Sequence, residues 1–296
     1  MSTYCHNVSL VLSGGGARGY AHIGAIEVLE ERGYKICSVC GTSMGALVGG
    51  IYCTGQIETV KEWALSLTRR DILSLADWSV GNNHLIKGDK IINRLMQIVP
   101  DRPIEELPIP YRAVAADLST CRELVFSRGS LYRAIRASIS IPSFFKPITA
   151  GTHLLVDGSV SNPLPLNRIV RQKGDLLFAV DVNAPLSKEV ESLQSRAIAY
   201  KQGQLSTLWS EKIMRRFTTE HPGSNYFSLL ASAFAMMVMR ASVQSKKITP
   251  PDLCAEMPMN RFGMFEFDRA ANIIRAGREA MSAALDTWES KQDPHF

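Results

Sequence analysis

LVLSGGGARGYAHIG, residues 10–24, leads from an apolar run into a glycine-rich turn and then into a helical pattern. The apolar residues 8–13 predict a buried strand, and apolar residues at helical spacing predict a helix over 18–32. Three of the glycines spell GxGxxG, the fingerprint of a dinucleotide-binding turn. Glycine amides can also hold a different anion, so the residues that follow must decide the role of this loop.

A second strand and a second helix follow the first pair. KICSVC, residues 35–40, predicts a strand, and MGALVGGIYCTG, residues 44–55, begins a helix. Strand, helix, strand, helix implies a parallel sheet with helices on its faces. The chain continues with a mostly helical stretch to Val99 and then with further strands and helices, expected at 111–118, 123–127, 130–138, 153–159, 175–182 and 265–285. We therefore expect one α/β domain spanning residues 1–296.

Two segments of the second half depart from this pattern. Residues 186–225 are polar and basic without an apolar strand run, which makes them the candidate for an excursion or lid. YFSLLASAFAMMVM, residues 226–239, is apolar almost all round. This run is shorter than the roughly 20 residues that cross a bilayer, so it predicts a buried core helix.

Composition and charge exclude some functions. The chain is 46% hydrophobic and 21% charged, as expected for a globular protein, and its net charge of +5 is spread without a basic run. This distribution does not imply nucleic-acid binding, although it leaves room for a weak attraction to anionic membranes. The N-terminus lacks the basic start and apolar run of a signal peptide, so we expect a cytoplasmic location.

The six cysteines are scattered rather than arranged as a disulfide framework, which suits a reducing compartment. Cys37 and Cys40 form a CxxC pair that is open to two interpretations, a redox or metal site and two core residues of a strand. No second cysteine or histidine pair stands at zinc-finger spacing. We therefore expect both cysteines to be core residues.

The second strand decides against a dinucleotide. Such a site needs an acidic residue near the end of that strand, about 20 residues after the glycines, and residues 33–57 contain neither Asp nor Glu. In its place stands GTSMG, residues 41–45, a GxSxG between a strand and a helix. This is the setting of a nucleophile elbow, in which Ser43 occupies a strained turn at a helix N-terminus.

A nucleophile elbow gives the glycine loop another task. Acyl transfer forms an oxyanion, and backbone N–H groups aimed at it stabilise the transition state by about 3 to 4 kcal/mol each. Gly14, Gly15 and Gly16 can turn their amides into such an oxyanion hole, together with the amide of Met44 after the nucleophile. We also place Arg18 at this oxyanion hole, where its side chain would steady the loop or attract an anionic substrate. The alternative is a solvated side chain in the first turn of the helix.

The general base is harder to find. The histidines lie at the ends, in the first helix, in polar loops or on a strand (His6, His22, His84, His153, His221 and His295). His153 stands four residues before Asp157, roughly 13 Å away at strand rise, so both cannot serve one serine. Asp157 follows an apolar strand, and the strand ends of parallel sheets gather functional sites. The alternative is that Asp157 only forms an Asx turn at the end of its strand.

These motifs together resemble the patatin-like phospholipase family, and within it the bacterial proteins related to neuropathy target esterase. SGGGARG resembles the family's glycine-rich oxyanion loop, and GTSMG resembles its nucleophile elbow. RASISIPSFF, residues 136–145, is similar to the block before the last catalytic strand. DGSVSNPLP is similar to the block that carries the catalytic aspartate, and PPDLCAEMP with FEFDRAANIIRAG resembles the end of the related bacterial chains.

The resemblance implies a three-layer α/β/α fold with a mainly parallel sheet and a Ser43–Asp157 dyad that needs no histidine. It also implies cleavage of acyl esters of phospholipids or lysophospholipids, without a metal or another cofactor. A lipid transacylase would use the same residues, and a regulatory or scaffolding protein would keep them as a vestigial site. One departure stands in the aspartate block, where Ser159 replaces the usual glycine or alanine.

A lipid substrate also requires access to an interface. Trp209, Ile213 and Phe217 recur four residues apart, with basic residues between them, as in a helix that lies on an anionic membrane. Packing against the protein's own surface explains the same pattern. Peripheral contact with an anionic membrane is therefore an expectation that stays open here.

Overall fold

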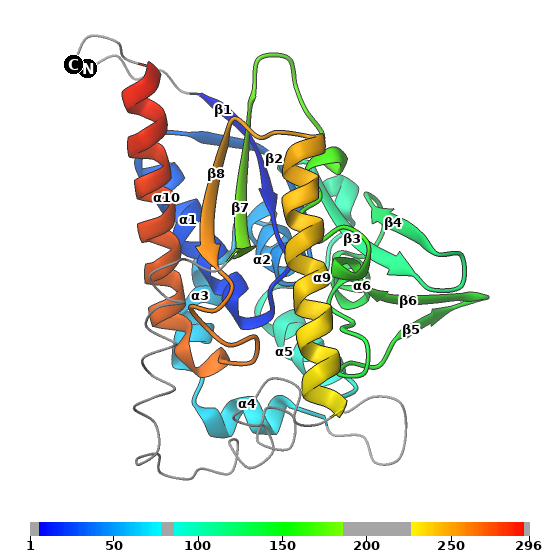
Figure 1. Cartoon of the computed structure of the whole chain (residues 1–296). Helices are drawn as coiled ribbons and strands as arrows, with labels where there is room; N and C mark the ends of the chain where they lie inside the picture. The colour runs from blue at the N-terminus through cyan, green and yellow to red at the C-terminus, as the bar shows by residue number, and fades with distance from the viewer. Residues whose placement is uncertain (1–5, 78–85, 186–225, 293–296) are drawn as a thin grey trace, which may run out of the picture.

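The computed structural model describes residues 6–77, 86–185 and 226–292. They form three layers, with a central sheet between helices (Figure 1). The sheet has eight strands, whose pairing links them as β5-β6-β3-β2-β1-β7-β8, with β4 also paired to β3. The predicted three-layer α/β fold with a mainly parallel sheet is confirmed. The strands are β1 Asn7–Leu12, β2 Lys35–Thr42, β3 Tyr111–Asp117, β4 Arg122–Phe126, β5 Ile148–Ala150, β6 His153–Asp157, β7 Leu176–Ala184 and β8 Leu253–Pro258.

The strands β1, β2, β3, β7 and β8 run parallel, whereas β4 and β6 run antiparallel to β3. The described helices are α1 Ala21–Glu31, α2 Met44–Cys53, α3 Ile57–Ser66, α4 Arg69–Leu75, α5 Asp89–Ile98, α6 Leu131–Ser138, α9 Tyr226–Ile248 and α10 Ala270–Gln292. The helix expected over 18–32 begins as a 3-10 turn, η1 Gly16–Tyr20, and becomes α-helical at α1. The predicted β-strands and helices are otherwise present, with small shifts at their ends.

Alternation along β1 separates the two faces of the sheet. Leu10 and Leu12 belong to the large core on the side of α1 and α2, whereas Val11 belongs to a smaller cluster with Leu164 and Leu166. Successive side chains of a strand point to opposite faces, and burial of both faces explains the near-continuous apolar run. The helix α9 lies over this second face, in contact with β7 and the 3-10 turn η4 Leu166–Arg168.

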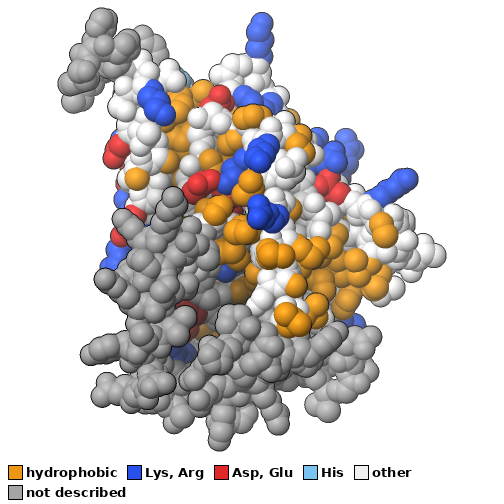
Figure 2. Space-filling view, in the orientation of Figure 1, with side chains coloured by type: hydrophobic (Ala, Val, Ile, Leu, Met, Phe, Trp, Pro, Cys, Tyr) orange, Lys and Arg blue, Asp and Glu red, His pale blue; other side chains and the backbone are white. Residues whose placement is uncertain are grey.

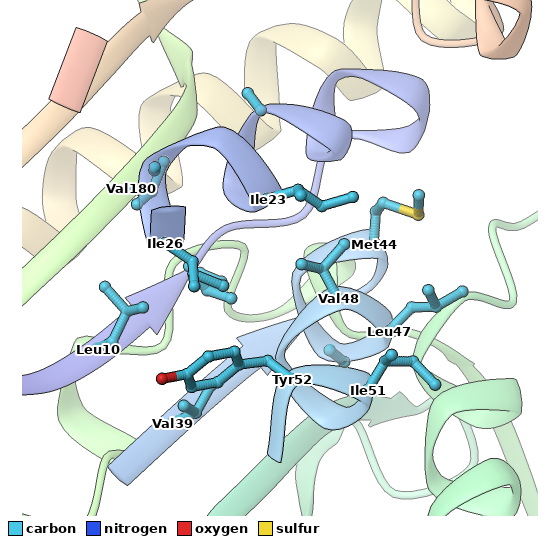
Figure 3. Packing of buried hydrophobic residues seen from close by; sticks show 14 of the residues in the cluster. Leu10, Ile23, Ile26, Val39, Met44, Leu47, Val48, Ile51, Tyr52 and Val180 are labelled. Atoms are coloured by element: carbon cyan, nitrogen blue, oxygen red, sulfur yellow. The ribbon is translucent and has the colours of Figure 1, made fainter. Parts of the chain in front are cut away.

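The large core forms where α1 and α2 pack on the strands. Figure 3 shows side chains of both helices meeting those of β1, β2 and β7, among them Ile26 of α1, Val48 of α2 and Val180 of β7. These side chains are almost fully buried, and each contributes about 1.5 to 3 kcal/mol of hydrophobic stabilisation relative to exposure. This packing fixes the turns that precede α1 and α2.

One edge of β3 receives two strands from opposite directions. Thr42, the last residue of β2, pairs with Val114, and Asp157, the last residue of β6, pairs with the next residue, Ala115. Both strands lie on the same edge, because β4 pairs with residues 113–117 and so occupies the other edge. The end of β2 therefore meets the end of β6 in the middle of the sheet.

The prediction of a buried core helix at residues 226–239 is wrong. The residues belong to α9, but Leu229, Met236 and Met237 are among the most exposed large hydrophobic side chains of the described chain. The helix covers the sheet from outside, with Val238 and Ser242 buried on its inner side. An apolar sequence does not reveal this one-sided burial.

Three further features concern the CxxC cysteines, residues 186–225 and the length of the apolar helices. Cys40 is buried and Cys37 half-buried on β2, both as free thiols, which confirms them as strand residues. Residues 186–225, the predicted excursion or lid, lie outside the described residues. Within residues 6–77, 86–185 and 226–292, no helix is long and apolar enough to cross a membrane.

Candidate active site

Ser43 occupies the turn between β2 and α2, with φ 54° and ψ −124°. A positive φ is strained for a residue with a side chain, and such strain is typical of functional turns. The turn packs closely at its two glycines. A Cβ at Gly41 would lie 2.3 Å from the carbonyl oxygen of Gly45, and one at Gly45 would lie 2.3 Å from that of Leu12. The predicted strained turn is present.

The hydroxyl of Ser43 donates to Asp157 Oδ2 at 2.5 Å, and both residues are almost completely buried. The other carboxylate oxygen, Oδ1, accepts the backbone N–H of Ser159 at 2.8 Å. The meeting of β2 and β6 on one edge of β3 brings these residues together across 114 positions of sequence. A serine and a buried carboxylate in direct contact have the arrangement that a nucleophile and its proton acceptor require.

Burial raises the pKa of Asp157 to about 6, while hydrogen bonds from Ser43 and Ser159 oppose the rise. Loss of hydration disfavours the charged carboxylate, which explains the direction of the shift. At neutral pH the group is mostly ionised and is more basic than an exposed aspartate. A proton acceptor with a pKa near the working pH is the most effective general base.

Ser138 supports the turn from α6. Its hydroxyl accepts the backbone N–H of Ser43 at 2.8 Å and donates to the carbonyl oxygen of Val114 at 2.6 Å. This side chain therefore links the strained turn to β3. The sequence gives no signal for this role, although Ser138 stands in the RASISIPSFF block.

No histidine of the described chain reaches this pair. His153, the first residue of β6, has its Nδ1 2.7 Å from Asp117 Oδ2, at the opposite end of the strand from Asp157. His22 is buried in α1 with Nε2 2.8 Å from the carbonyl oxygen of Ser13, and burial lowers its pKa to about 4. His6 stacks on Tyr34 at the far end of β1. The other three histidines lie outside the described residues.

The glycine loop lies beside the serine, but its amides are not equivalent. The N–H of Gly14 donates to the carbonyl oxygen of Pro163 at 2.9 Å, which corrects the expectation that this amide faces an oxyanion. Within the described part of the chain, the amides of Gly15 and Gly16 donate to no protein acceptor. Met44, as the first residue of α2, has an N–H without a carbonyl partner in its helix.

Two contacts fix the shape of this loop. Gly16 has φ +59°, and a Cβ there would lie 2.4 Å from the carbonyl oxygen of Met264. Asn183, at the end of β7, donates from Nδ2 to the carbonyl oxygen of Gly14 at 2.6 Å. Asn183 is not identified by the sequence analysis, because its place near the end of an apolar strand is the one signal that the sequence offers.

The side chain of Arg18 is buried, so the alternative of a solvated arginine is wrong. Its Nη2 donates to Asn183 Oδ1 at 3.0 Å, and its Nη1 donates to the carbonyl oxygen of Met259 at 3.1 Å. Burial lowers the pKa of Arg18 to about 10, so the group stays charged at neutral pH. The side chain steadies the loop, and this structure gives it no direct part in an oxyanion hole.

A small cavity adjoins the pair, and a larger cavity lies next to it. A small one of about 20 Å³ is lined by Ser43, Asp157 and Ser159, and a large one of about 760 Å³ is lined mainly by apolar side chains of α2, α3, α4 and α9. Ile141, Phe234 and Met264 line both, so the two spaces share a wall. Over the residues that the structure describes, no group of three or more His, Cys, Asp or Glu side chains could hold a metal ion.

Comparison with known proteins finds relatives of this chain. The sequence profile described as patatin-like phospholipase matches residues 10–169. An uncharacterized NTE family protein of Mycobacterium tuberculosis is 33% identical, over 97% of this chain and 93% of that protein. Human patatin-like phospholipase domain-containing protein 6 is 27% identical over 96% of this chain, which corresponds to 20% of the human protein. Among solved structures, VipD from Legionella pneumophila aligns with a TM-score of 0.46 at 14% identity, covering 95% of this chain and 67% of VipD.

A serine at a strained strand-to-helix turn, beside a large apolar cavity, is typical of α/β esterases that act on lipids. The chain belongs to the patatin-like phospholipase family, with relatives named as NTE family proteins. It is a lipid esterase by this membership. The resemblance inferred from the sequence is thereby confirmed at the level of the family.

Proposed function

We propose that this protein is a serine acyl hydrolase that cleaves carboxylic esters of phospholipids or lysophospholipids through a Ser43–Asp157 dyad. The observation that supports it most directly is the 2.5 Å hydrogen bond from the Ser43 hydroxyl to Asp157 Oδ2, buried at the meeting point of two strands. The phospholipase names of the family and of the human relative agree with this substrate class.

The reaction proceeds in two halves. Asp157 takes the proton of Ser43 as Oγ attacks the ester carbonyl, and the collapsing tetrahedral intermediate expels the alcohol, which receives that proton. Water then attacks the acyl-serine, gives its proton to Asp157 and releases the fatty acid as Ser43 regains its hydrogen. A pKa of about 6 lets Asp157 accept and return the proton near neutral pH.

The oxyanion hole consists of the amides of Gly15, Gly16 and Met44. The first two belong to the glycine loop, and the third opens α2, whose N-terminal dipole favours negative charge. Gly14 and Arg18 act indirectly in this proposal, because their polar groups are bonded within the protein and set the shape of the loop.

The apolar cavity accommodates the acyl chain. Its volume of about 760 Å³ lies within the range of ligand sites, and its lining carries few polar atoms that could hold a water-soluble substrate. Met44 both lines this cavity and follows the nucleophile, so an acyl chain lying there brings its carbonyl carbon to Ser43.

Labelling with a fluorophosphonate, followed by mass spectrometry, tests the nucleophile and its base together. The wild type is expected to be modified at Ser43 and to hydrolyse a short-chain nitrophenyl ester, and Asp157→Asn is expected to lose both activities. Full hydrolysis by Ser43→Ala would overturn the assignment. A folded wild type without labelling or hydrolysis would favour a regulatory or scaffolding protein, and acyl transfer to an added alcohol in preference to water would favour a transacylase.

The place of action is proposed as the cytoplasm, with peripheral contact to anionic membrane. The sequence carries a net charge of +5, and a lipid substrate requires an interface. The basic, aromatic segment around Trp209 and Phe217 lies outside the described residues, so its role stays a prediction.

A further inference from the structure

The outer side of α9 presents large apolar side chains to solvent. Leu229 is 58% exposed, Met236 58% and Met237 61%, although the helix belongs to a well-packed domain. Figure 2 shows hydrophobic side chains gathered over the lower half of α9, next to those of the neighbouring strands. A contiguous apolar patch on the surface of a globular protein marks a site of interaction with a partner or a membrane.

The charge pattern of α9 suits a lipid surface. Residues 226–239 contain no charged residue, and the exposed basic residues Arg240 and Lys247 follow on the same helical face. Helices that lie on membranes combine an apolar surface with lysine and arginine, which attract anionic headgroups. A protein partner of ordinary acidic and polar surface would not require an uncharged stretch of this length.

The other half of α9 is fixed to the sheet. Lys246 Nζ lies 2.9 Å from Oδ2 of the buried Asp181, and Ser245 Oγ donates to the carbonyl oxygen of Leu164 at 2.5 Å. This anchoring holds the apolar part of the helix at a defined place above the active site.

The same helix also borders the two cavities near Ser43. Leu230, Ala231 and Phe234 line the large apolar cavity, and Phe234 with Val238 lines the small cavity that contains Ser43. The exposed patch and the lining of the cavity therefore lie on adjoining faces of one helix. A lipid that enters the cavity beside α9 stays in contact with apolar surface throughout.

We propose that the α9 patch, defined as Leu229, Met236 and Met237, is the surface that docks this protein on an anionic lipid bilayer. The proposal rests on the proposed lipid hydrolase function and adds to it the face that meets the substrate. The patch lies in the interfacial layer, the basic residues face the headgroups, and the cavity opens toward the lipid supply.

Flotation with vesicles of mixed phosphatidylcholine and phosphatidylglycerol tests this assignment, in a Ser43→Ala background so that no lipid is hydrolysed. The variant Met236→Glu/Met237→Glu is expected to bind at least about tenfold more weakly, because two carboxylates replace side chains that enter the interface. Leu65→Glu is the matched control, since Leu65 is an exposed leucine on α3 and lines neither cavity. The control is expected to bind like the parent chain.

Hydrolysis of a water-soluble short ester separates docking from catalysis. In the catalytically active background, the double variant is expected to keep this activity while losing activity on vesicles. Equal binding of the double variant and the parent chain would overturn the proposal, as would a parent chain that does not bind vesicles. A parent chain that forms a dimer dissolved by the double substitution would assign the patch to a second copy instead. Vesicle binding without any ester hydrolysis would refute the proposed function and leave the docking surface standing.

Discussion

Thr42 and Asp157 end two strands that approach each other from opposite directions along one edge of β3. Their partners, Val114 and Ala115, are adjacent residues. The residue after Thr42 is the serine of the turn, so the sheet itself sets the distance between Ser43 and Asp157.

Removal of the Ser159 hydroxyl is expected to shift the pH dependence of hydrolysis. In the proposed mechanism the carboxylate of Asp157 is the active form, and the hydroxyl and the N–H of Ser159 both stabilise it. In Ser159→Ala the pKa of Asp157 therefore rises above its value of about 6, and the acid limb of kcat/KM moves to higher pH by roughly half a unit to one unit. A pH profile measures this shift.

Ser161→Ala is the control for this experiment. Ser161 stands two residues further on and donates to the carbonyl oxygen of Gly158, not to the carboxylate. An unchanged limb in Ser161→Ala with a shifted limb in Ser159→Ala supports the role of the hydroxyl. A uniform loss of rate in Ser159→Ala, with the limb unmoved, would contradict it.

Asp157 is expected to cost stability at neutral pH. Its pKa in the folded protein, about 6, lies above the ordinary value of 3.8, so the folded state binds more protons between these values. Stability from this group therefore falls as the pH rises from about 4 to about 6, by at most about 3 kcal/mol. Asp157→Asn removes the ionisation and is expected to raise the free energy of unfolding at pH 7.

Urea denaturation at several pH values checks this expectation. The advantage of Asp157→Asn over the wild type should be largest at pH 7 and shrink toward pH 4. A variant that is equally or less stable at pH 7 would show that burial of the charge is not a stability cost here.

Loss of the Ser138 hydroxyl is expected to reduce kcat with little change in KM. Ser138→Ala leaves the N–H of Ser43 and the carbonyl of Val114 without their bonded partner, at a cost of about 1 to 3 kcal/mol each. The turn then relaxes, and kcat falls by about tenfold or more. Steady-state kinetics on a soluble ester separates the two constants.

Ser140→Ala provides the comparison, because Ser140 is a buried serine of the same block bonded to Arg136 rather than to Ser43. It should lower the melting temperature while leaving kcat nearly unchanged. If both variants lowered kcat equally, the contact between Ser138 and the turn would not be the cause.

Substitution of Gly16 is expected to disable the glycine loop. Gly16→Ala adds a Cβ that meets the carbonyl oxygen of Met264 at 2.4 Å, in a backbone conformation with φ +59°. A displaced amide no longer faces the oxyanion, which corresponds to a loss of about 10² to 10³ in kcat. Gly174→Ala has a similar positive φ, +86°, but meets no atom within 4 Å, so strain alone should leave its kcat intact. Equal effects of the two substitutions would refute the loop assignment.

The parts of the site that follow from local sequence could be predicted. The elbow at Ser43 depends on a strand, two glycines and a helix that all lie within residues 35–53, and Asp157 stands at a recognisable strand end. Local patterns specify such turns directly. The α/β fold followed from the same alternation of strands and helices.

The parts that depend on distant contacts could not be predicted. The amide of Gly14 is engaged by Pro163, and the loop's carbonyl by Asn183, each about 150 or more positions away. The prediction that α9 is a buried core helix was wrong for a related reason. Its sequence is apolar on all sides, and only the position of β7 decides which side is covered.

The loop that carries the first motif is held by residues that come much later in the chain. Ser13 accepts the N–H of Val182, Gly14 accepts Asn183, and Arg18 reaches Met259 beyond β8. The region that the family profile matches ends at residue 169, before all of these partners. A fragment that ended at residue 169 would keep the glycine loop, Ser43 and Asp157, but it would lack the strand that flanks β1 and the anchors of its glycine loop. The proposed active site therefore depends on residues after position 169 as well as on the segment that contains its motifs.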